Sequence, residues 1–262
     1  SCPYSCTFCF HTIGNRYRLR DIDDVFGEID FQISKYKVEF LLLQDELFAL
    51  SLKRVKAFCQ RIKKYNIPWY VPLRAEQVTD ELLTILKEAN CISIFIGSES
   101  ADNSILKSMK KKTTIEEIEV ATEKIKSIGI EVTSCFIFGD VNETFESAKN
   151  TLNWWQEHSE YNFGLAPIKL YPGTQLYRHA IENNLINDPV QFHKDNCPIT
   201  NVSKMSDDEL GKIMEEITFI AYRCGSRINK GEIVNQQSHI YTIRGECSHC
   251  QSNNTWDNVI FF

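Results

Sequence analysis

Apolar runs of strand length alternate with helical repeats through the first two thirds of the chain. After Asp21, for example, Ile22, Val25, Phe26 and Ile29 recur at the spacing of one helix face. Continuous apolar runs are typical of parallel strands that are covered on both faces. Because strands and helices alternate, right-handed β-α-β crossovers and a parallel sheet are expected. The predicted strands are residues 38–44, 69–73, 92–96, 132–138 and 165–170.

Capping residues mark where several helices begin. Thr79 precedes one helix, and Thr114 with Glu117 forms a capping box for another. Ser206 and Glu209 repeat the capping-box pattern near the C-terminus. The pattern therefore predicts an α/β chain with five strands, and by itself it permits either a barrel or a doubly wound open sheet.

The pattern changes beyond residue 174. Residues 184–205 are polar and irregular, and 229–262 has the pattern of short strands and turns. We therefore predict two domains, a core over residues 1–190 and a small C-terminal α+β extension over 191–262.

Composition limits the classes of partner. The formal net charge is −6, whereas proteins that bind a phosphate backbone usually cluster Lys and Arg. No apolar run approaches the roughly 20 residues that a membrane span needs. Among the ten cysteines, Cys59, Cys91 and Cys135 lie inside apolar segments, as free thiols do in a reducing compartment. We expect a cytoplasmic protein that neither binds nucleic acid nor spans a membrane.

Three cysteines at the front of the chain carry the strongest chemical signal. Cys2, Cys6 and Cys9 have the spacing C-x3-C-x2-C, and Phe8 stands just before the third. Three thiolates on one loop can hold three corners of a cubane iron–sulfur cluster and leave the fourth iron open. An open coordination position is typical of a catalytic metal centre. The alternative is a zinc site completed by His11, because zinc also accepts thiolate and imidazole ligands.

This cysteine spacing resembles that of the radical S-adenosylmethionine (SAM) enzymes, whose loop also carries an aromatic where Phe8 stands. The resemblance covers about residues 1–190. It implies a partial (β/α)6 TIM-like barrel, a 4Fe–4S cluster on Cys2, Cys6 and Cys9, and reductive cleavage of SAM. In the family a strand leads into the loop, so we expect the first strand to be truncated here.

Polar residues at strand ends extend the resemblance, because active sites of parallel barrels lie at the carboxyl ends of the strands. Asp45 and Glu46 follow the first run, where the family contacts SAM; a solvated loop is the alternative. Arg74 suits a carboxylate of SAM or substrate, or a surface salt bridge. Glu99 and Ser100 match the family's Gly-x-Glu-Ser, whose polar groups face the ribose and the methionine carboxylate.

The fourth strand ends in Phe138 and Gly139, where the family packs adenine. The family's usual proline between this glycine and a Glu-Thr pair is absent, so the match is partial. Tyr171-Pro172-Gly173-Thr174 resembles the family's last-strand turn.

The pattern is most similar to the cobalamin-dependent branch, since Asp45, Glu46 and Phe48 match its paired acids and following Phe. This implies a cobalamin-binding domain upstream in the full-length protein, methylation of a small-molecule substrate of unknown class, and an electron donor such as flavodoxin or ferredoxin. Two alternatives remain. One is a tRNA-modifying methylthiotransferase, and the other is a zinc-binding interaction protein without turnover.

A second cysteine pair, Cys247 and Cys250, forms a C-x2-C knuckle near the C-terminus. One knuckle needs further ligands to close a tetrahedral site. We predict zinc or an auxiliary cluster there, with two free thiols as the alternative.

Overall fold

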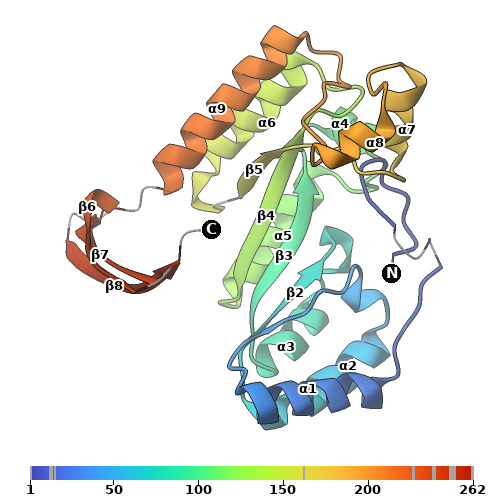
Figure 1. Cartoon of the computed structure of the whole chain (residues 1–262). Coiled ribbons are helices and arrows are strands. Elements are labelled where there is room, and N and C mark those ends of the chain that lie inside the picture. Colours follow the sequence, from blue (N-terminus) through green and yellow to red (C-terminus); the bar gives the residue numbers. More distant parts are fainter. Residues whose placement is uncertain are drawn as a thin grey trace. The chain divides into compact units, whose positions relative to one another are not determined.

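The computed structural model describes residues 2–11, 14, 16–161, 163–225, 228–237, 240–247 and 252–260. The chain forms two compact units, Ser1–Ile213 and Met214–Phe262, which are described separately below (Figure 1). Helix α9 (Asp207–Gly225) contains the division between them. In the part of the chain described, no helix combines the length and the apolar character needed to cross a membrane.

The first unit is built on a five-stranded parallel sheet with the order β1-β2-β3-β4-β5. Strand order equals chain order, so every crossover runs in the same direction. A doubly wound sheet would reverse its order at a switch point. The sheet is therefore the predicted partial TIM-like barrel. Its strands are β1 (Leu41–Leu42), β2 (Trp69–Leu73), β3 (Cys91–Glu99), β4 (Glu131–Phe138) and β5 (Gly164–Pro167).

Helices follow the strands as the sequence predicts, and α5 packs along β3 and β4 (Figure 1). The predicted caps are confirmed: Thr79 Oγ1 accepts from Leu82 N at 3.2 Å, and Glu117 N donates to Thr114 Oγ1 at 3.3 Å. The helices are α1 (Ile22–Tyr36), α2 (Leu52–Ile62), α3 (Asp80–Glu88), α4 (Asn103–Ser108), α5 (Ile115–Ser127), α6 (Phe145–Glu157), α7 (Gln175–Glu182) and α8 (Pro189–Lys194). Two 3-10 turns near strand ends are η1 (Phe48–Leu50) and η3 (Ala75–Gln77).

Strand β1 is shorter than predicted, because only Leu41–Leu42 of residues 38–44 has strand geometry. It lies at the edge of the sheet and has one strand neighbour, β2, among the described residues. Leu42 is 53% exposed and Phe40 44% exposed, so this apolar run is not buried on both faces. The apolar pattern predicted where this strand lies but overestimated its length, because it does not report that the strand is at the sheet edge.

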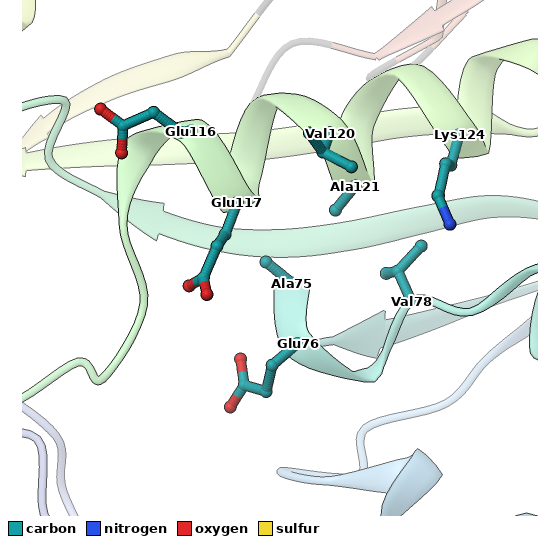
Figure 2. Close-up of a pocket in the computed structure, with 8 residues that line it drawn as sticks. All are labelled: Ala75, Glu76, Val78, Glu116, Glu117, Val120, Ala121 and Lys124. Atoms are coloured by element: carbon teal, nitrogen blue, oxygen red, sulfur yellow. The ribbon is translucent and has the colours of Figure 1, made fainter.

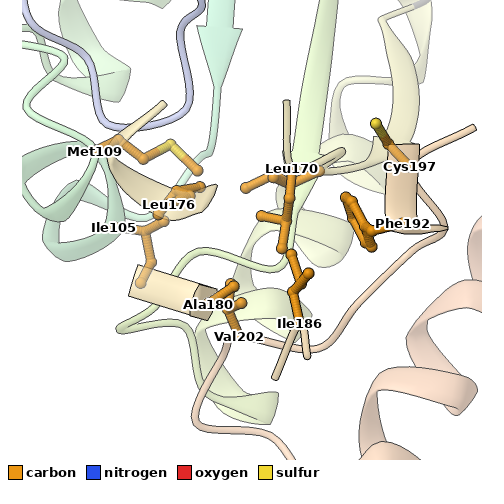
Figure 3. Close-up of a cluster of buried hydrophobic side chains, with 10 residues drawn as sticks. Ile105, Met109, Leu170, Leu176, Ala180, Ile186, Phe192, Cys197 and Val202 are labelled. Carbon is orange, nitrogen blue, oxygen red and sulfur yellow. The ribbon is translucent and has the colours of Figure 1, made fainter. Parts of the chain in front are cut away.

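Residues beyond 184 contribute to the first unit, although we predicted a domain boundary near 190. Asp188 caps α8, accepting from Val190 N and Gln191 N at 2.9 Å each, and so orders a segment that we expected to be irregular. The compact units divide after Ile213 because α8 and the residues that follow it pack into the first unit. The buried residues they join, here called the α4–α7–α8 core, are Ile105, Met109, Ile168, Leu170, Leu176, Ala180, Ile186, Phe192, Cys197 and Val202 (Figure 3).

The second unit contains a three-stranded antiparallel sheet with the order β6-β7-β8. Its strands are β6 (Ile228–Gln237), β7 (Ile240–Cys247) and β8 (Asn253–Ile260). These strands fit the prediction of short strands and turns over 229–262.

Phe192 gives a test of the packing beyond residue 190. It is 7% exposed, so Phe192→Ala should lower the free energy of unfolding of the first unit by about 3–5 kcal/mol through lost burial and a cavity. Val190 lies on the same helix and is 64% exposed, so Val190→Ala should change that free energy by less than about 0.5 kcal/mol. Urea unfolding measures both. Equal stability of the two variants would contradict the packing.

Candidate functional site

The loop that carries the first three cysteines is held by backbone hydrogen bonds on two sides. Thr7 N donates to Met109 O at 3.1 Å, just after α4, and Thr7 O accepts from Leu176 N at 3.2 Å in the first turn of α7. Within the loop, Cys9 N donates to Cys6 O at 3.2 Å. The loop is therefore fixed to helices that follow two different strands.

The three thiols of this loop are free and lie close enough to influence one another. Cys6 is buried, and Cys2 and Cys9 are half-buried. Burial, with smaller contributions from the charges of Cys6, Cys2 and Glu46, raises the pKa of Cys9 to about 11. Burial likewise raises the pKa of Cys2, with a further contribution from Cys6. A cluster that binds these thiolates would need nearby positive charge to offset the cost of ionising them.

That positive charge comes from Arg74 and Lys111. The charge of Arg74 lowers the pKa of Cys2 against the effect of burial, and the charge of Lys111 acts in the same way on Cys9. Among the residues that the structure describes, no three His, Cys, Asp or Glu side chains are positioned to hold one metal ion. A cubane cluster needs no such convergence, because each cysteine binds a separate iron. The loop thus supplies three separate thiols, as a cubane cluster requires.

Arg74 lies directly after β2 and its side chain is 9% exposed. Its Nε pairs with Glu76, one terminal nitrogen donates to the carbonyl of Lys111, and the other lies 3.9 Å from Cys6 Sγ. The guanidinium carbon lies 3.9 Å from the centre of the Tyr4 ring. Arg74 thus lies beside Cys6 and Tyr4, and its predicted contact with a carboxylate of SAM or substrate stays a prediction.

Glu99 forms a buried ion pair at the end of β3. Its Oε1 lies 2.7 Å from Lys111 Nζ, and the Lys111 residue is 6% exposed. Glu99 has a left-handed backbone with φ +67°, where the β3–β4 register shifts. A Cβ on Gly97 would lie 2.6 Å from Lys111 Nζ and 2.7 Å from Glu99 Oε1, so a side chain here would displace the ends of the paired side chains. Strained backbone of this kind is concentrated at functional sites.

The Ser100 side chain forms hydrogen bonds within the chain. Its hydroxyl lies 3.1 Å from Thr151 Oγ1 of α6 and accepts from Asp102 N at 3.1 Å. Ser100 is 1% exposed. In this structure the hydroxyl joins β3 to α6, and its contact with SAM stays a prediction.

Of the two predicted acids after β1, Glu46 acts on the cysteine loop, whereas Asp45 has a local contact. Asp45 Oδ1 accepts from Leu47 N at 3.2 Å and so caps the turn before η1. The charge of Glu46 raises the pKa of both Cys2 and Cys9, which brings this carboxylate within electrostatic range of the loop. Glu46 is thus the better candidate of the two for a contact with SAM.

The aromatic residues matched to the family are packing residues here. Phe48 is 7% exposed and lies edge-on against Phe58 and Trp69, with ring centres 5.3 and 6.0 Å away. Phe8 packs against the α4–α7–α8 core, which further anchors the cysteine loop. The cofactor contact predicted for Phe8 stays a prediction.

The end of β4 carries two acids that sequence analysis left out of the site. Phe138 is 1% exposed, and Gly139, with φ +115°, donates from its N to Glu143 Oε2 at 2.5 Å. Asp140 and Glu143 are fully buried, and Ser108 donates to Asp140 Oδ1. In the described part of the chain, Asp140 Oδ2 and Glu143 Oε1 have no hydrogen-bond partner. The sequence did contain a signal, because Asp140 comes one residue after an apolar strand, much as Asp45 and Glu46 follow theirs.

A surface groove of about 330 Å³ lies away from these residues, between η3 and α5 (Figure 2). Its acids already have partners: Glu76 pairs with Arg74, Glu116 accepts from Asn103, and Glu117 belongs to the Thr114 capping box. The groove adjoins the predicted site at Ala75 and Glu76, which directly follow Arg74.

The C-terminal cysteine pair, Cys247 and Cys250, lies largely outside the part of the chain that the structure describes. Cys247 ends β7, but its side chain and all of Cys250 lie outside the described residues. Metal binding by this pair stays a prediction.

The buried acids give a prediction for pH dependence. Burial is the main cause that raises the pKa of Glu143 from 4.5 to about 7, and the negative charge of Asp140 adds to it. A raised pKa stabilises the fold at low pH, and this contribution is lost as the pH rises from about 4.5 through about 7. Linkage converts the shift into about 3 kcal/mol of unfolding free energy.

Glu143→Gln should remove that pH dependence, because the amide does not titrate. Urea unfolding between pH 5 and pH 8, roughly the span of the shift, would compare the variant with the wild type. Glu88→Gln, whose side chain is 62% exposed before substitution, is the control and should keep the wild-type pH profile. The same pH profile in all three proteins would contradict a raised pKa for Glu143.

Comparison with known proteins agrees with the geometry. Residues 1–154 match the Radical SAM superfamily. An uncharacterised methyltransferase of Pyrococcus horikoshii is 28% identical over 189 residues, which cover 71% of this chain and 41% of that protein. An anaerobic magnesium-protoporphyrin IX monomethyl ester cyclase of Rubrivivax gelatinosus is 26% identical over 221 residues, covering 82% of this chain and 39% of the relative.

Among solved structures, the radical SAM methyltransferase TsrM from Kitasatospora setae, with cobalamin and a [4Fe-4S] cluster bound, has a similar fold. The TM-score is 0.60 at 20% identity, covering 68% of this chain and 36% of that chain. This chain therefore spans less than half the length of these relatives. Since the family match covers more than half of this chain, and its three cysteines lie on a loop anchored to the barrel, the chain belongs to the radical SAM superfamily.

Proposed function

We propose that this chain is the core of an enzyme that cleaves SAM reductively at a [4Fe–4S] cluster on Cys2, Cys6 and Cys9. The observation that carries the proposal is the set of three free thiols on one anchored loop, with Arg74 and Lys111 beside them. When bound, such a cluster supplies the electron that splits SAM into methionine and a 5′-deoxyadenosyl radical. The residues of the chain hold and orient the reactants and exclude competing reactions.

The residues at the strand ends support the binding of SAM beside the loop. Glu46 lies within electrostatic range of Cys2 and Cys9, so its carboxylate could accept a charge-assisted hydrogen bond from the SAM ammonium. Glu99 and Lys111 present opposite charges from a buried pair, where electrostatic interactions are strong because little water screens them. The apolar end of β4, with Phe138 and Gly139, offers packing for an adenine ring.

We further propose that the whole protein uses cobalamin and methylates a small molecule. Support comes from methyltransferases among the relatives, including the Pyrococcus horikoshii protein and TsrM, which has cobalamin bound. The electron would come from a donor protein such as flavodoxin or ferredoxin. The chain spans 36% of TsrM, so binding of cobalamin and substrate concerns the whole protein. That the substrate is a small molecule and that the protein is cytoplasmic both stay predictions.

Cys6→Ala tests the proposal. After anaerobic reconstitution with iron and sulfide, the wild type should bind a cluster and form 5′-deoxyadenosine from SAM and dithionite. Cys6→Ala should lose both properties, because a second iron, besides the open one, would have no protein ligand. Iron and sulfide analysis and chromatography of the nucleoside measure the outcome.

Cys135→Ala is the matched control, because Cys135 is another half-buried free thiol, on β4, and should keep both properties. Circular dichroism would show that both variants are folded. A wild type that binds zinc but neither iron nor sulfide, and leaves SAM intact, would contradict the proposal.

A further inference from the structure

Arg74 is a buried cation that contacts the cysteine loop at two points. One terminal nitrogen donates a long hydrogen bond to Cys6 Sγ at 3.9 Å, and the guanidinium carbon lies 3.9 Å from the centre of the Tyr4 ring. Arg74 and Cys6 are each 8% exposed. Because arginine stays protonated in proteins, the charge beside Cys6 is permanent.

Two other contacts fix the direction of the guanidinium. Its Nε pairs with Glu76, and the second terminal nitrogen donates to the carbonyl of Lys111. All three nitrogens are thus engaged within the chain. The planar fork of an arginine suits several directed contacts of this kind, whereas a lysine would offer one point charge.

The carboxylate of Glu76 also reaches the loop, through a hydrogen bond with Tyr4, and it pairs with the Nε side of the guanidinium. Glu76 contacts Nε, whereas Cys6 contacts a terminal nitrogen. The Glu76 side chain is 31% exposed and lines the surface groove of Figure 2, so water screens it more than it screens the guanidinium. Both charges therefore lie beside the loop, but the guanidinium is the one that contacts Cys6 and the one that water screens less.

We propose that Arg74 is a positioning residue that fixes Cys6 and raises the reduction potential of the iron–sulfur cluster. The inference rests on the proposed function. The step concerned is the addition of one electron from an external donor to the oxidised cluster, with no bond formed or broken. Hydrogen bonds to cluster sulfurs and the net charge around a cluster set its potential. A fixed cation beside Cys6 favours the reduced state, which carries one more negative charge.

This role differs measurably from the one predicted from sequence, which was contact with a carboxylate of SAM or substrate. A SAM ligand would affect SAM affinity and would leave the potential of the cluster unchanged when SAM is absent. A charge beside Cys6 acts on the cluster whether or not SAM is bound. The potential without SAM therefore separates the two roles.

The experiment is a redox titration of the reconstituted full chain without SAM, followed by electron paramagnetic resonance of the reduced cluster. In Arg74→Gln, the ratio of reduced to oxidised cluster at a fixed potential should fall at least about tenfold, which is about 59 mV for a one-electron couple. Arg74→Lys keeps the charge and should shift that ratio less.

Arg61→Gln is the matched control. Arg61 also pairs with an acid, Asp23, and lies over an aromatic ring, with its guanidinium carbon 4.3 Å from the centre of Phe26. It belongs to α2 and, in the described part of the chain, does not contact the cysteines, so its substitution should leave the potential unchanged. Iron and sulfide content is measured for every variant.

The outcomes separate this inference from the function it rests on. A loaded Arg74→Gln with the wild-type potential overturns the inference and leaves the proposed function intact. If Arg74→Gln loses iron while Arg74→Lys keeps both iron and potential, the requirement for charge is supported. Loss of iron in both Arg74 variants overturns it, because shape alone would then explain the residue. A wild type that takes up no cluster defeats the proposed function and the inference together.

Discussion

Three sulfurs can share one cluster only if the short loop that carries them keeps a fixed shape, and the first unit supplies that constraint. The loop has few residues of its own to bury, so its backbone is held from outside. Thr7 hydrogen-bonds both to Met109, after α4, and to Leu176, in α7. Phe8 packs on the α4–α7–α8 core. The apolar packing of helices distant in sequence therefore determines the geometry of the chemical site.

Charge is the second constraint, because ionised groups are costly to bury without partners. The site contains buried cations and acids that are paired with one another. Lys111 pairs with Glu99, and its backbone carbonyl accepts from Arg74, so the turn after α4 joins β3 to the end of β2. Gly97 leaves the space that this pair occupies. The end of β4 is different, since Asp140 and Glu143 are both acidic and fully buried.

Much of the fold was predictable, because apolar runs and capping residues report burial and helix starts directly. Thr79 and Thr114 cap helices as predicted, and β2 spans the predicted residues 69–73. Features that depend on distant neighbours were not predictable. The length of β1 depends on its position at the sheet edge, and the extent of the first unit depends on packing by Phe192.

The site was predictable to a similar degree. Sequence spacing singled out the three cysteines, and the strand ends singled out Glu46, Arg74 and Glu99, whose contacts with SAM stay predictions. Lys111 was missed because a lysine in the run 110–112 has the appearance of a solvated surface charge. Its burial follows from the turn after α4, which sequence spacing does not reveal. Ser100 was identified, but its contact with Thr151 on α6 could not be inferred from the motif.

The anchoring of the cysteine loop has a consequence for how small a working core can be. The family match ends at residue 154, before β5 and α7. Yet the amide of Leu176 and the side chain of Gln175 both bind the loop, and α7 is itself packed against Ile186 and Phe192. A fragment cut at the end of the matched region would keep all three sulfurs but lose one side of their support. The minimal cluster-binding piece thus extends well past the segment by which the family is detected.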